Sequence, residues 1–211
     1  MSALFDRLSR LFADGHARGE LELLSDARFA DAERTSEAAV LIAVTDRPTG
    51  LKQRSGRPDF DGPGVILTQR PRTMRDHPGQ VAFPGGKLDP GEDAVAAALR
   101  EGWEELGLDP AAVRVIGATD RYRTGTGFDI TPVLGVIPPD LPLSPHRREV
   151  ESWFEAPLGL LMDERNWRSN TLFWKGAERQ FYEMDHDGYR IWGVTAAICA
   201  NLSRRLAWSV M

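Results

Sequence analysis

The chain has 211 residues, of which 42% are hydrophobic and 27% charged, a composition typical of one globular domain large enough to bury a core. Its net charge of −5 at pH 7 gives no electrostatic basis for binding nucleic acid or an anionic membrane. Cys199 is the only cysteine, which excludes an intrachain disulfide or a cysteine-based metal site, and its apolar neighbours predict a place in the core.

The first segment of the chain predicts an amphipathic helical arm. Apolar residues recur there at helical spacing: Leu4, Phe5, Leu8, Leu11 and Phe12. We expect this stripe to pack on its own domain or on a partner subunit, so a homodimer is one expectation. A polar connector follows at 13–36, which divides the chain into an arm and connector (1–36) and a main domain (37–211).

Neither export nor a membrane span is expected. Asp6 and Asp14 disfavour a secretory signal in the arm. The longest clean apolar run, 38–44, is far shorter than the ~20 residues that a bilayer requires. We therefore expect a cytoplasmic protein.

The main domain predicts a mixed sheet flanked by helices, an α/β fold with α/β/α layers. Strands are predicted at Ala38–Thr45, Val65–Arg70 (antiparallel to the first), Val113–Arg123 and Phe128–Ile137, the last interrupted by Pro132. The later elements are an extended segment at Glu149–Phe154, a short helix at Pro157–Asp163, a hairpin of Leu172–Tyr182 with Tyr189–Trp192 around Asp185–Gly188, and a closing helix at Gly193–Ser209. Loops are expected at 46–64 and 138–148.

One predicted helix, Val95–Leu106, carries three neighbouring carboxylates. Glu101, Glu104 and Glu105 fall on one side of it, while Trp103 falls among the apolar residues of the other side. Like charges at this spacing destabilise a helix by roughly 0.2–0.5 kcal/mol per pair, whereas a hard divalent cation prefers such oxygen ligands. A solvated acidic face is the alternative interpretation. The glycine turn that ends at Gly86, just upstream, favours the metal site because backbone can approach an ion there.

A donor-rich segment precedes the glycine turn. It contains Arg70, Arg75, His77 and Gln80. Arginine is suited to bidentate recognition of phosphate, so this segment predicts contacts with an anionic substrate. An ordinary solvated loop is the alternative for any one of these residues.

The spacing Gly86, five residues, Glu92, seven residues, Arg100-Glu101, two residues, Glu104-Glu105, one residue, Gly107-Leu108 resembles the Nudix box without a gap. Gly102 departs from the larger residue usual at its position. The preceding stretch, Leu67 to Gly86, resembles the signature of the coenzyme A pyrophosphatase branch of the Nudix superfamily, with Pro71 as a departure.

The resemblance implies a Nudix-type α/β/α sandwich that hydrolyses the diphosphate of coenzyme A or its thioesters to 4′-phosphopantetheine and 3′,5′-ADP. It implies Mg²⁺ or Mn²⁺ as cofactor, held by Glu101, Glu104, Glu105 and the Gly85 carbonyl. The implied substrate contacts are Arg70, Arg75, His77, Gln80, Gly85 and Gly86. Glu92 and Arg100 then keep the loop and the helix in register.

The identity of the general base stays open at this point. A carboxylate takes the proton from metal-bound water in this chemistry, and Glu101, Glu104, Glu149 and Glu151 are candidates. Spacing in the family favours Glu149. Two other functions also stay open: hydrolysis of another nucleoside diphosphate derivative, such as ADP-ribose or a dinucleoside polyphosphate, and a Nudix-fold binding module without turnover. The intact set of three glutamates argues against the binding module.

Overall fold

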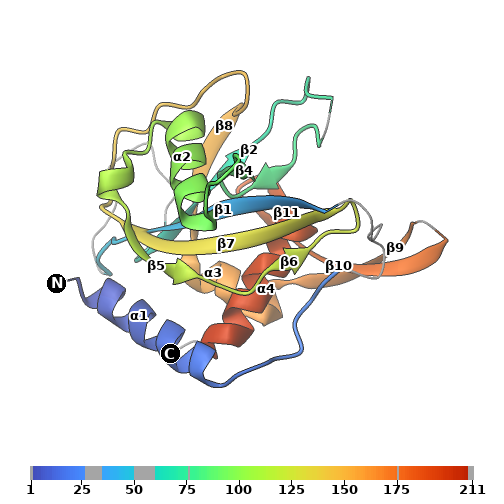
Figure 1. Ribbon diagram of the computed structural model, residues 1–211, viewed down its shortest axis with the longest axis horizontal. Helices are drawn as coiled ribbons and strands as arrows, with labels where there is room; N and C mark the ends of the chain where they lie inside the picture. Colours follow the sequence, from blue (N-terminus) through green and yellow to red (C-terminus); the bar gives the residue numbers. More distant parts are fainter. Residues whose placement is uncertain (1, 27–34, 50–59, 76, 175, 209–211) are drawn as a thin grey trace.

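The structure is a computed structural model that describes residues 2–26, 35–49, 60–75, 77–174 and 176–208. Its centre is a mixed sheet in which β1 (Ser36–Thr45) runs parallel to β7 (Phe128–Ile137) along their whole length. Both strands are rich in aliphatic residues, as strands covered on both faces must be. Within the described residues this sheet has eight strands, with the central order β3-β2-β1-β7-β5 (Figure 1).

The remaining strands extend this sheet or lie at its edges. β2 (Gly64–Gln69) lies antiparallel to β1, as expected, and also pairs with β3 (Val81–Ala82) and β8 (Ser152–Pro157). The short β4 (Gly85–Lys87) pairs with β1, while β5 (Arg114–Ala118) and β6 (Tyr122–Arg123) pair with β7.

Helices cover both faces of the sheet, which confirms the predicted layers (Figure 1). One face carries α2 (Ala94–Leu106), followed by the short turn η2 (Pro110–Ala112). The other face carries α1 (Ala3–Ala17), α3 (Leu158–Met162) with the turn η3 (Glu164–Asn166), and α4 (Val194–Leu206). Among the described residues, none of these helices combines the length and the apolar character that crossing a bilayer needs.

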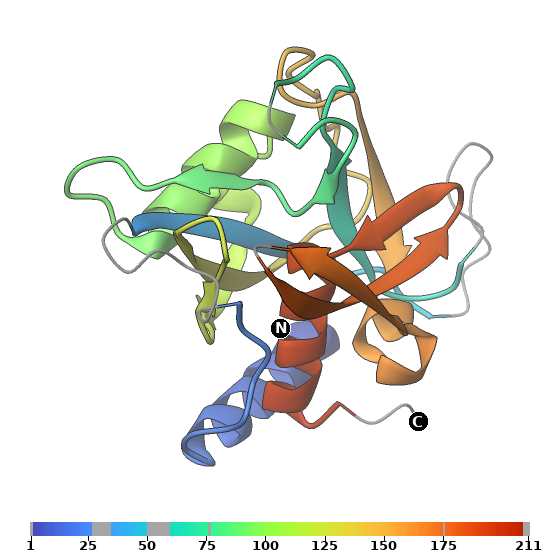
Figure 2. The ribbon, with the colours of Figure 1, turned by 90° about the vertical axis from the view of Figure 1, so that its right-hand side faces the viewer.

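A second, smaller sheet projects beside α4 (Figure 2). Its strands are β9 (Arg168–Trp174), β10 (Ala177–His186) and β11 (Tyr189–Trp192), in the order β11-β10-β9. Asp187 and Gly188 form the turn between β10 and β11. Their φ angles are 49° and 79°, as a two-residue hairpin loop of this type requires, since it needs positive φ at both positions. The expected turn is therefore present, but the expected first strand, Leu172–Tyr182, is wrong. That stretch is divided between β9 and β10, and Glu183–His186 pair with β11 instead.

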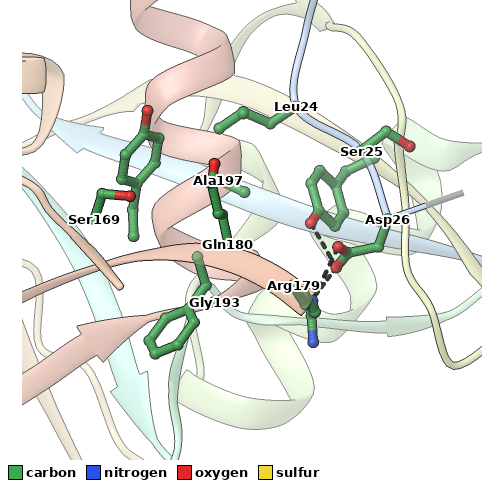
Figure 3. A pocket seen from close by; sticks show the side chains of 11 residues that line it. Leu24, Ser25, Asp26, Ser169, Arg179, Gln180, Gly193 and Ala197 are labelled. Carbon is green, nitrogen blue, oxygen red and sulfur yellow. Dashed lines mark hydrogen bonds and ion pairs between the residues drawn. The ribbon is translucent and has the colours of Figure 1, made fainter. Parts of the chain in front are cut away.

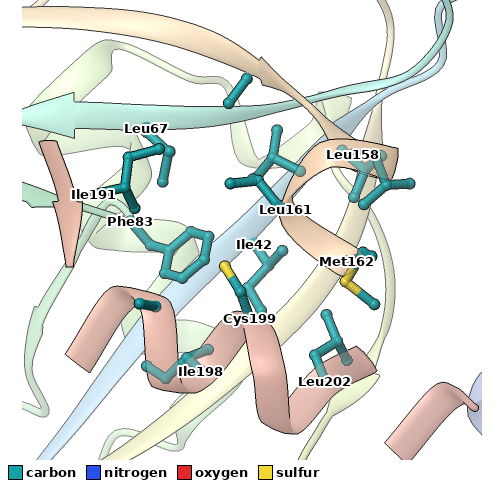
Figure 4. Packing of buried hydrophobic residues seen from close by; sticks show 14 of the residues in the cluster. Ile42, Leu67, Phe83, Leu158, Leu161, Met162, Ile191, Ile198, Cys199 and Leu202 are labelled. Atoms are coloured by element: carbon teal, nitrogen blue, oxygen red, sulfur yellow. The ribbon is translucent and has the colours of Figure 1, made fainter. Parts of the chain in front are cut away.

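Two apolar clusters fill the space between the layers. The cluster under α4 includes Ile42, Leu67, Phe83, Leu161, Ile198 and Cys199 (Figure 4). Cys199 is 3% exposed, so the predicted core position is confirmed. The cluster under α2 contains Ala39, Leu41 and Ala43 from β1, since alternate residues of a strand face opposite sides.

The N-terminal stripe packs within its own chain. Leu8 is 1% exposed and belongs to the cluster under α4, with Leu4, Phe5, Leu11 and Phe12 packed around it. The residues that suggested a homodimer thus cover the sheet and α4 of the same molecule. The N-terminal arm therefore belongs to the helical layer that also contains α3 and α4.

Three expected boundaries differ from the structure. The predicted strand Val113–Arg123 is divided into β5 and β6, with a bulge between Val115 and Gly117. Pro132 does not interrupt β7; it pairs with Val40 in the parallel ladder, and its carbonyl accepts a hydrogen bond from Thr119. The extended segment expected at 149–154 forms β8 only from Ser152. The expected loop at 46–64 lies partly outside the described residues.

Candidate active site

The helix α2 begins and ends at the signals the sequence carries. The Asp93 side chain accepts a hydrogen bond from the Ala96 amide at 2.8 Å, which caps the first turn. Gly107, at φ 65°, ends the helix in the left-handed conformation, and its amide donates to carbonyls of the last turn. The helix is therefore held at both ends of its thirteen residues.

Small residues bring α2 close to the sheet. Ala97, Ala98 and Leu106 are fully buried against it. A Cβ on Gly102 would lie 3.2 Å from the Leu41 side chain, so the glycine that departs from the family pattern marks a close approach of helix and strand. Trp103 was expected on this apolar side, but it is 55% exposed, because the helix presents its small residues to the sheet and turns the indole outward.

The three carboxylates of α2 lie in different surroundings. Glu105 is 6% exposed, and its Oε2 has no hydrogen-bond partner among the described residues. The side chain of Glu101 is 13% exposed, and that of Glu104 is 50% exposed. The set thus runs from the protein interior to solvent along one side of the helix.

Burial dominates the acidity of the two inner carboxylates. It raises the pKa of Glu105 to about 8, with repulsion from Glu101 adding to the effect and the charge of Arg70 opposing it. Burial also raises the pKa of Glu101, and the hydrogen bond from Arg100 opposes that rise. A bound cation would lower the free-energy cost of ionising these two neighbouring carboxyl groups.

Arg100 ties the loop before α2 to the helix. Its Nε donates to Glu92 Oε1 and its Nη2 to Glu92 Oε2, each at 3.0 Å, while Nη2 also reaches the carbonyl of Lys87 at 3.0 Å. The same guanidinium contacts Glu101 and Glu104 at 3.0 Å. This hydrogen bonding lowers the pKa of Glu92. The family assignment of Glu92 and Arg100 as residues that hold the loop in register agrees with these contacts.

The residues present fit a hard divalent cation. In the described segments, no three His, Cys, Asp or Glu side chains are arranged as a metal cluster, and Arg100 contacts two of the three glutamates instead. The donor set is nevertheless all oxygen, the buried Oε2 of Glu105 has no partner, and Gly86 leaves the space that the Glu101 carboxylate fills. Glu101, Glu104 and Glu105 are thus suited to Mg²⁺ or Mn²⁺.

A cavity of about 160 Å³ has Arg70 in its lining, and the charge of Arg70 also acts on the carboxylate of Glu105. Arg70, His77 and Gln80, three of the residues predicted to contact the substrate, line one part of the cavity. The Nε of Arg70 is buried without a hydrogen-bond partner among the described residues, and His77 has a left-handed φ of 54°, a conformation that costs a non-glycine residue energy. Arg75 is exposed on the same loop and is not among the residues of this lining.

Backbone of the glycine turn connects the cavity with the carboxylates. Gly85 pairs with Val40 of β1, which lines the cavity, and a Cβ on Gly85 would lie 2.7 Å from the Val40 side chain. The Gly85 backbone also hydrogen-bonds to Glu105 and lowers its pKa. Glycine is needed at this position because β1 and β4 approach too closely for a side chain.

Glu149 and Glu151 differ in what they contact. The charge of Glu149 contributes to the raised pKa of both Glu101 and Glu105, so its carboxylate lies within electrostatic reach of the inner pair. It also lies 3.2 Å from His146 Nδ1. The Glu151 carboxylate instead accepts a hydrogen bond from the amide of Arg72 at 3.1 Å. Of Glu149 and Glu151, two of the candidates for the general base, Glu149 is the one whose charge acts on Glu101 and Glu105.

The apolar part of the cavity was not predicted from the sequence. Its residues come from β1, β3 and the residue after it, β7 and α4, and they include Val40, Phe83, Phe128, Ile130, Val194 and Ile198. The stretches 125–135 and 191–196, which also resemble the coenzyme A pyrophosphatase branch, though more weakly than Leu67 to Gly86, were the signal available in the sequence. Only the packing of α4 against the sheet brings these two stretches together.

A second cavity, also of about 160 Å³, lies between the connector, β10 and α4 (Figure 3). The Tyr122 hydroxyl donates to the buried Asp26 carboxylate at 2.8 Å, and Arg179 donates to it from Nε at 2.9 Å. Burial raises the pKa of Tyr122, and the charge of Asp26 adds to the rise. None of the predicted site residues is among its lining residues, and its buried acid is paired within the protein.

The fold, the helix that carries the three glutamates and a match to a family model together identify the family of this chain. The NUDIX domain model matches residues 54–172, more than half of the chain, and the chain therefore belongs to the Nudix hydrolase family. Among its relatives is NudL of Escherichia coli O7:K1, described as an uncharacterized Nudix hydrolase. It is 39% identical over 171 residues, which are 81% of this chain and 82% of the relative. NudL of E. coli K12 is 38% identical over the same shares.

Solved structures with a similar fold include a Nudix hydrolase from M. smegmatis, RenU, and an Ap4A hydrolase from C. elegans. The first is 22% identical, with a TM-score of 0.46, over 59% of this chain and 72% of that one. The second is 20% identical, with a TM-score of 0.44, over 59% of this chain and 81% of that one. Likenesses of this size say nothing about the substrate of this chain.

Proposed function

We propose that the protein is a metal-dependent coenzyme A diphosphatase, which hydrolyses coenzyme A or its thioesters to 4′-phosphopantetheine and 3′,5′-ADP. The observation that carries the proposal is the stretch Leu67 to Gly86, directly before the box. Its Arg70, His77 and Gln80 line one cavity, and the charge of Arg70 acts on Glu105. In the branch that this stretch resembles, it accompanies hydrolysis of coenzyme A.

The proposed chemistry addresses charge repulsion. A diphosphate is polyanionic, and a Mg²⁺ or Mn²⁺ ion would neutralise part of that charge and acidify a bound water. Glu101, Glu104 and Glu105 are the side chains proposed to hold the ion, with the Gly85 carbonyl as a further ligand. Their oxygen donors and the partnerless Oε2 of Glu105 support this assignment.

The remaining residues bind the substrate, position the ligands or move a proton. Arg70, with a partnerless Nε, is proposed to donate to the diphosphate together with His77 and Gln80, and the exposed Arg75 to reach the part of the substrate outside the cavity. Glu149 is proposed to take the proton from the attacking water, since its charge already acts on Glu101 and Glu105.

A substrate panel tests the proposal. Coenzyme A, acetyl-coenzyme A, ADP-ribose and diadenosine tetraphosphate are incubated at equal concentration with the full chain and Mg²⁺ or Mn²⁺, and the products are separated by chromatography. We expect 4′-phosphopantetheine and 3′,5′-ADP from coenzyme A at the highest kcat/KM. Cleavage of ADP-ribose or diadenosine tetraphosphate with coenzyme A left intact would reject the proposal. Loss of cleavage in Arg70→Ala, with retained folding, would support the substrate contact.

A further inference from the structure

The cavity that Arg70 lines is chemically divided. Arg70, His77 and Gln80 supply its polar part, whereas the rest of its lining is mainly aliphatic and aromatic. Among the described residues, none that line it is acidic. One part of the cavity is therefore suited to an anion and the other to an uncharged apolar group.

The threonine hydroxyls of the lining are already engaged by the protein. Thr195 Oγ1 donates to the Val81 carbonyl at 2.9 Å. Thr124 Oγ1 accepts from the Phe128 amide at 2.9 Å and lies 3.0 Å from Thr126 Oγ1. A buried ligand hydroxyl that finds no partner costs roughly 1–3 kcal/mol. A hydroxyl-rich sugar is consequently a poor occupant of the apolar part.

Two lining residues connect the cavity with Glu105. Val40 pairs with Gly85, whose backbone hydrogen-bonds to Glu105. Arg70 acts on the charge of Glu105. A diphosphate that contacts Arg70 would therefore place the group esterified to it at the cavity that Arg70 lines. The size is sufficient, because a cavity of about 150 Å³ accepts a six-carbon ring.

We propose that this cavity binds the branched segment of the substrate that carries two methyl groups next to the diphosphate, and that it decides which half of the diphosphate ester enters. The inference rests on the proposed function. In coenzyme A, one side of the diphosphate is esterified to a CH₂ that is followed by a carbon with two methyl groups, and the other side to a hydroxyl-bearing ribose. The dimethyl side matches the lining of Val40, Ile130 and Val194. ADP-ribose and dinucleoside polyphosphates carry ribose on both sides and offer no such group.

Binding of the two separate products tests the inference without requiring turnover. Titration calorimetry of the full chain with Mg²⁺ measures the Kd of 4′-phosphopantetheine and of 3′,5′-ADP. Val40→Thr and Val194→Thr keep the shape of valine and add one hydroxyl each. Each is expected to weaken 4′-phosphopantetheine about fivefold or more and to leave 3′,5′-ADP within about twofold. Val115→Thr, a partly buried position on β5 outside the lining, is the matched control and should change neither Kd.

A second variant guards against misfolding of the threonine forms. Val194→Leu fills the cavity instead of adding a hydroxyl, and it should weaken the same product. Equal weakening of both products, weakening of 3′,5′-ADP alone, or no binding of 4′-phosphopantetheine to the wild type would each overturn the inference. These binding results are independent of the substrate panel, so a wild type that binds 4′-phosphopantetheine selectively yet leaves coenzyme A intact would reject the proposed function alone.

Discussion

The Glu101 carboxylate lies in the space that a side chain on Gly86 would need: a Cβ on Gly86 would overlap the Oε1 of Glu101. The glycine comes from β4 and the glutamate from α2, so the strand and the helix meet at the carboxylate. A side chain at this position would therefore displace the neighbouring acid, whereas the backbone angle of Gly86 does not itself call for glycine.

Gly86→Ala is expected to displace the Glu101 carboxylate. Because a misplacement of about 1 Å at a catalytic centre can cost about 100-fold, we expect kcat/KM on the best substrate of the panel to fall by about that factor. Gly159→Ala is the control, since a Cβ there meets nothing within 4 Å. Steady-state kinetics on both variants tests this prediction. Similar activity in the two variants would show that Glu101 does not act in the site.

Glu105→Gln should change stability and metal affinity in opposite directions. Removing a carboxylate that is 6% exposed, with one partnerless oxygen, should stabilise the metal-free protein in urea unfolding. The same change should weaken Mn²⁺ binding, followed by electron paramagnetic resonance, about tenfold or more. Glu22→Gln, at an exposed position in the connector, should alter neither quantity. Unchanged Mn²⁺ affinity in Glu105→Gln would remove Glu105 from the ligand set.

The pair Arg205 and Asp120 joins α4 to the loop after β5. Arg205 Nε donates to Asp120 Oδ2 at 2.6 Å, and its Nη1 donates to carbonyls at the end of α1. The Arg205 side chain is 6% exposed. Breaking a buried pair on one side leaves an uncompensated charge, so Asp120→Asn should lower the free energy of unfolding by about 3–5 kcal/mol at pH 7.

The same pair should give a pH-dependent contribution to stability. Burial alone would raise the pKa of Asp120, but the hydrogen bonds and charge of Arg205 outweigh it and lower the pKa. The contribution is then complete above the unfolded-state value of about 3.9 and is lost as the pH falls through the lower folded value. The difference in unfolding free energy between wild type and Asp120→Asn should therefore shrink below about pH 4. An exposed control, Asp14→Asn, should show no large difference at either pH.

Cys199 should be unreactive while the protein is folded. Its burial raises the pKa of the thiol to about 12, and only the thiolate attacks disulfide reagents. We expect no labelling by 5,5′-dithiobis(2-nitrobenzoic acid) at pH 8 in the native protein and one thiol per chain in guanidinium chloride. Rapid labelling of the native protein would contradict the packing of α4 against Ile42 and Phe83 (Figure 4).

Local chemistry made much of the fold predictable. A run of aliphatic and β-branched residues predicted β1, and the helical spacing of apolar residues and glutamates predicted the box helix. Boundaries were less predictable where the deciding contact comes from another strand. Pro132 stays inside β7, where it pairs with Val40, and its carbonyl accepts a hydrogen bond from Thr119, just after β5.

The sequence by itself determined which residue types are available for the chemistry: three glutamates at helical spacing, a glycine turn before them, and a segment of donors upstream. The tertiary structure decided how deeply each of these side chains is buried. Trp103 is turned outward and Glu105 inward because α2 packs Ala97, Ala98 and Leu106 against the sheet. Spacing along one helix carries no information about the surface against which it packs. The apolar cavity likewise exists only where α4 closes over the sheet, since its walls come from segments that are far apart in the chain.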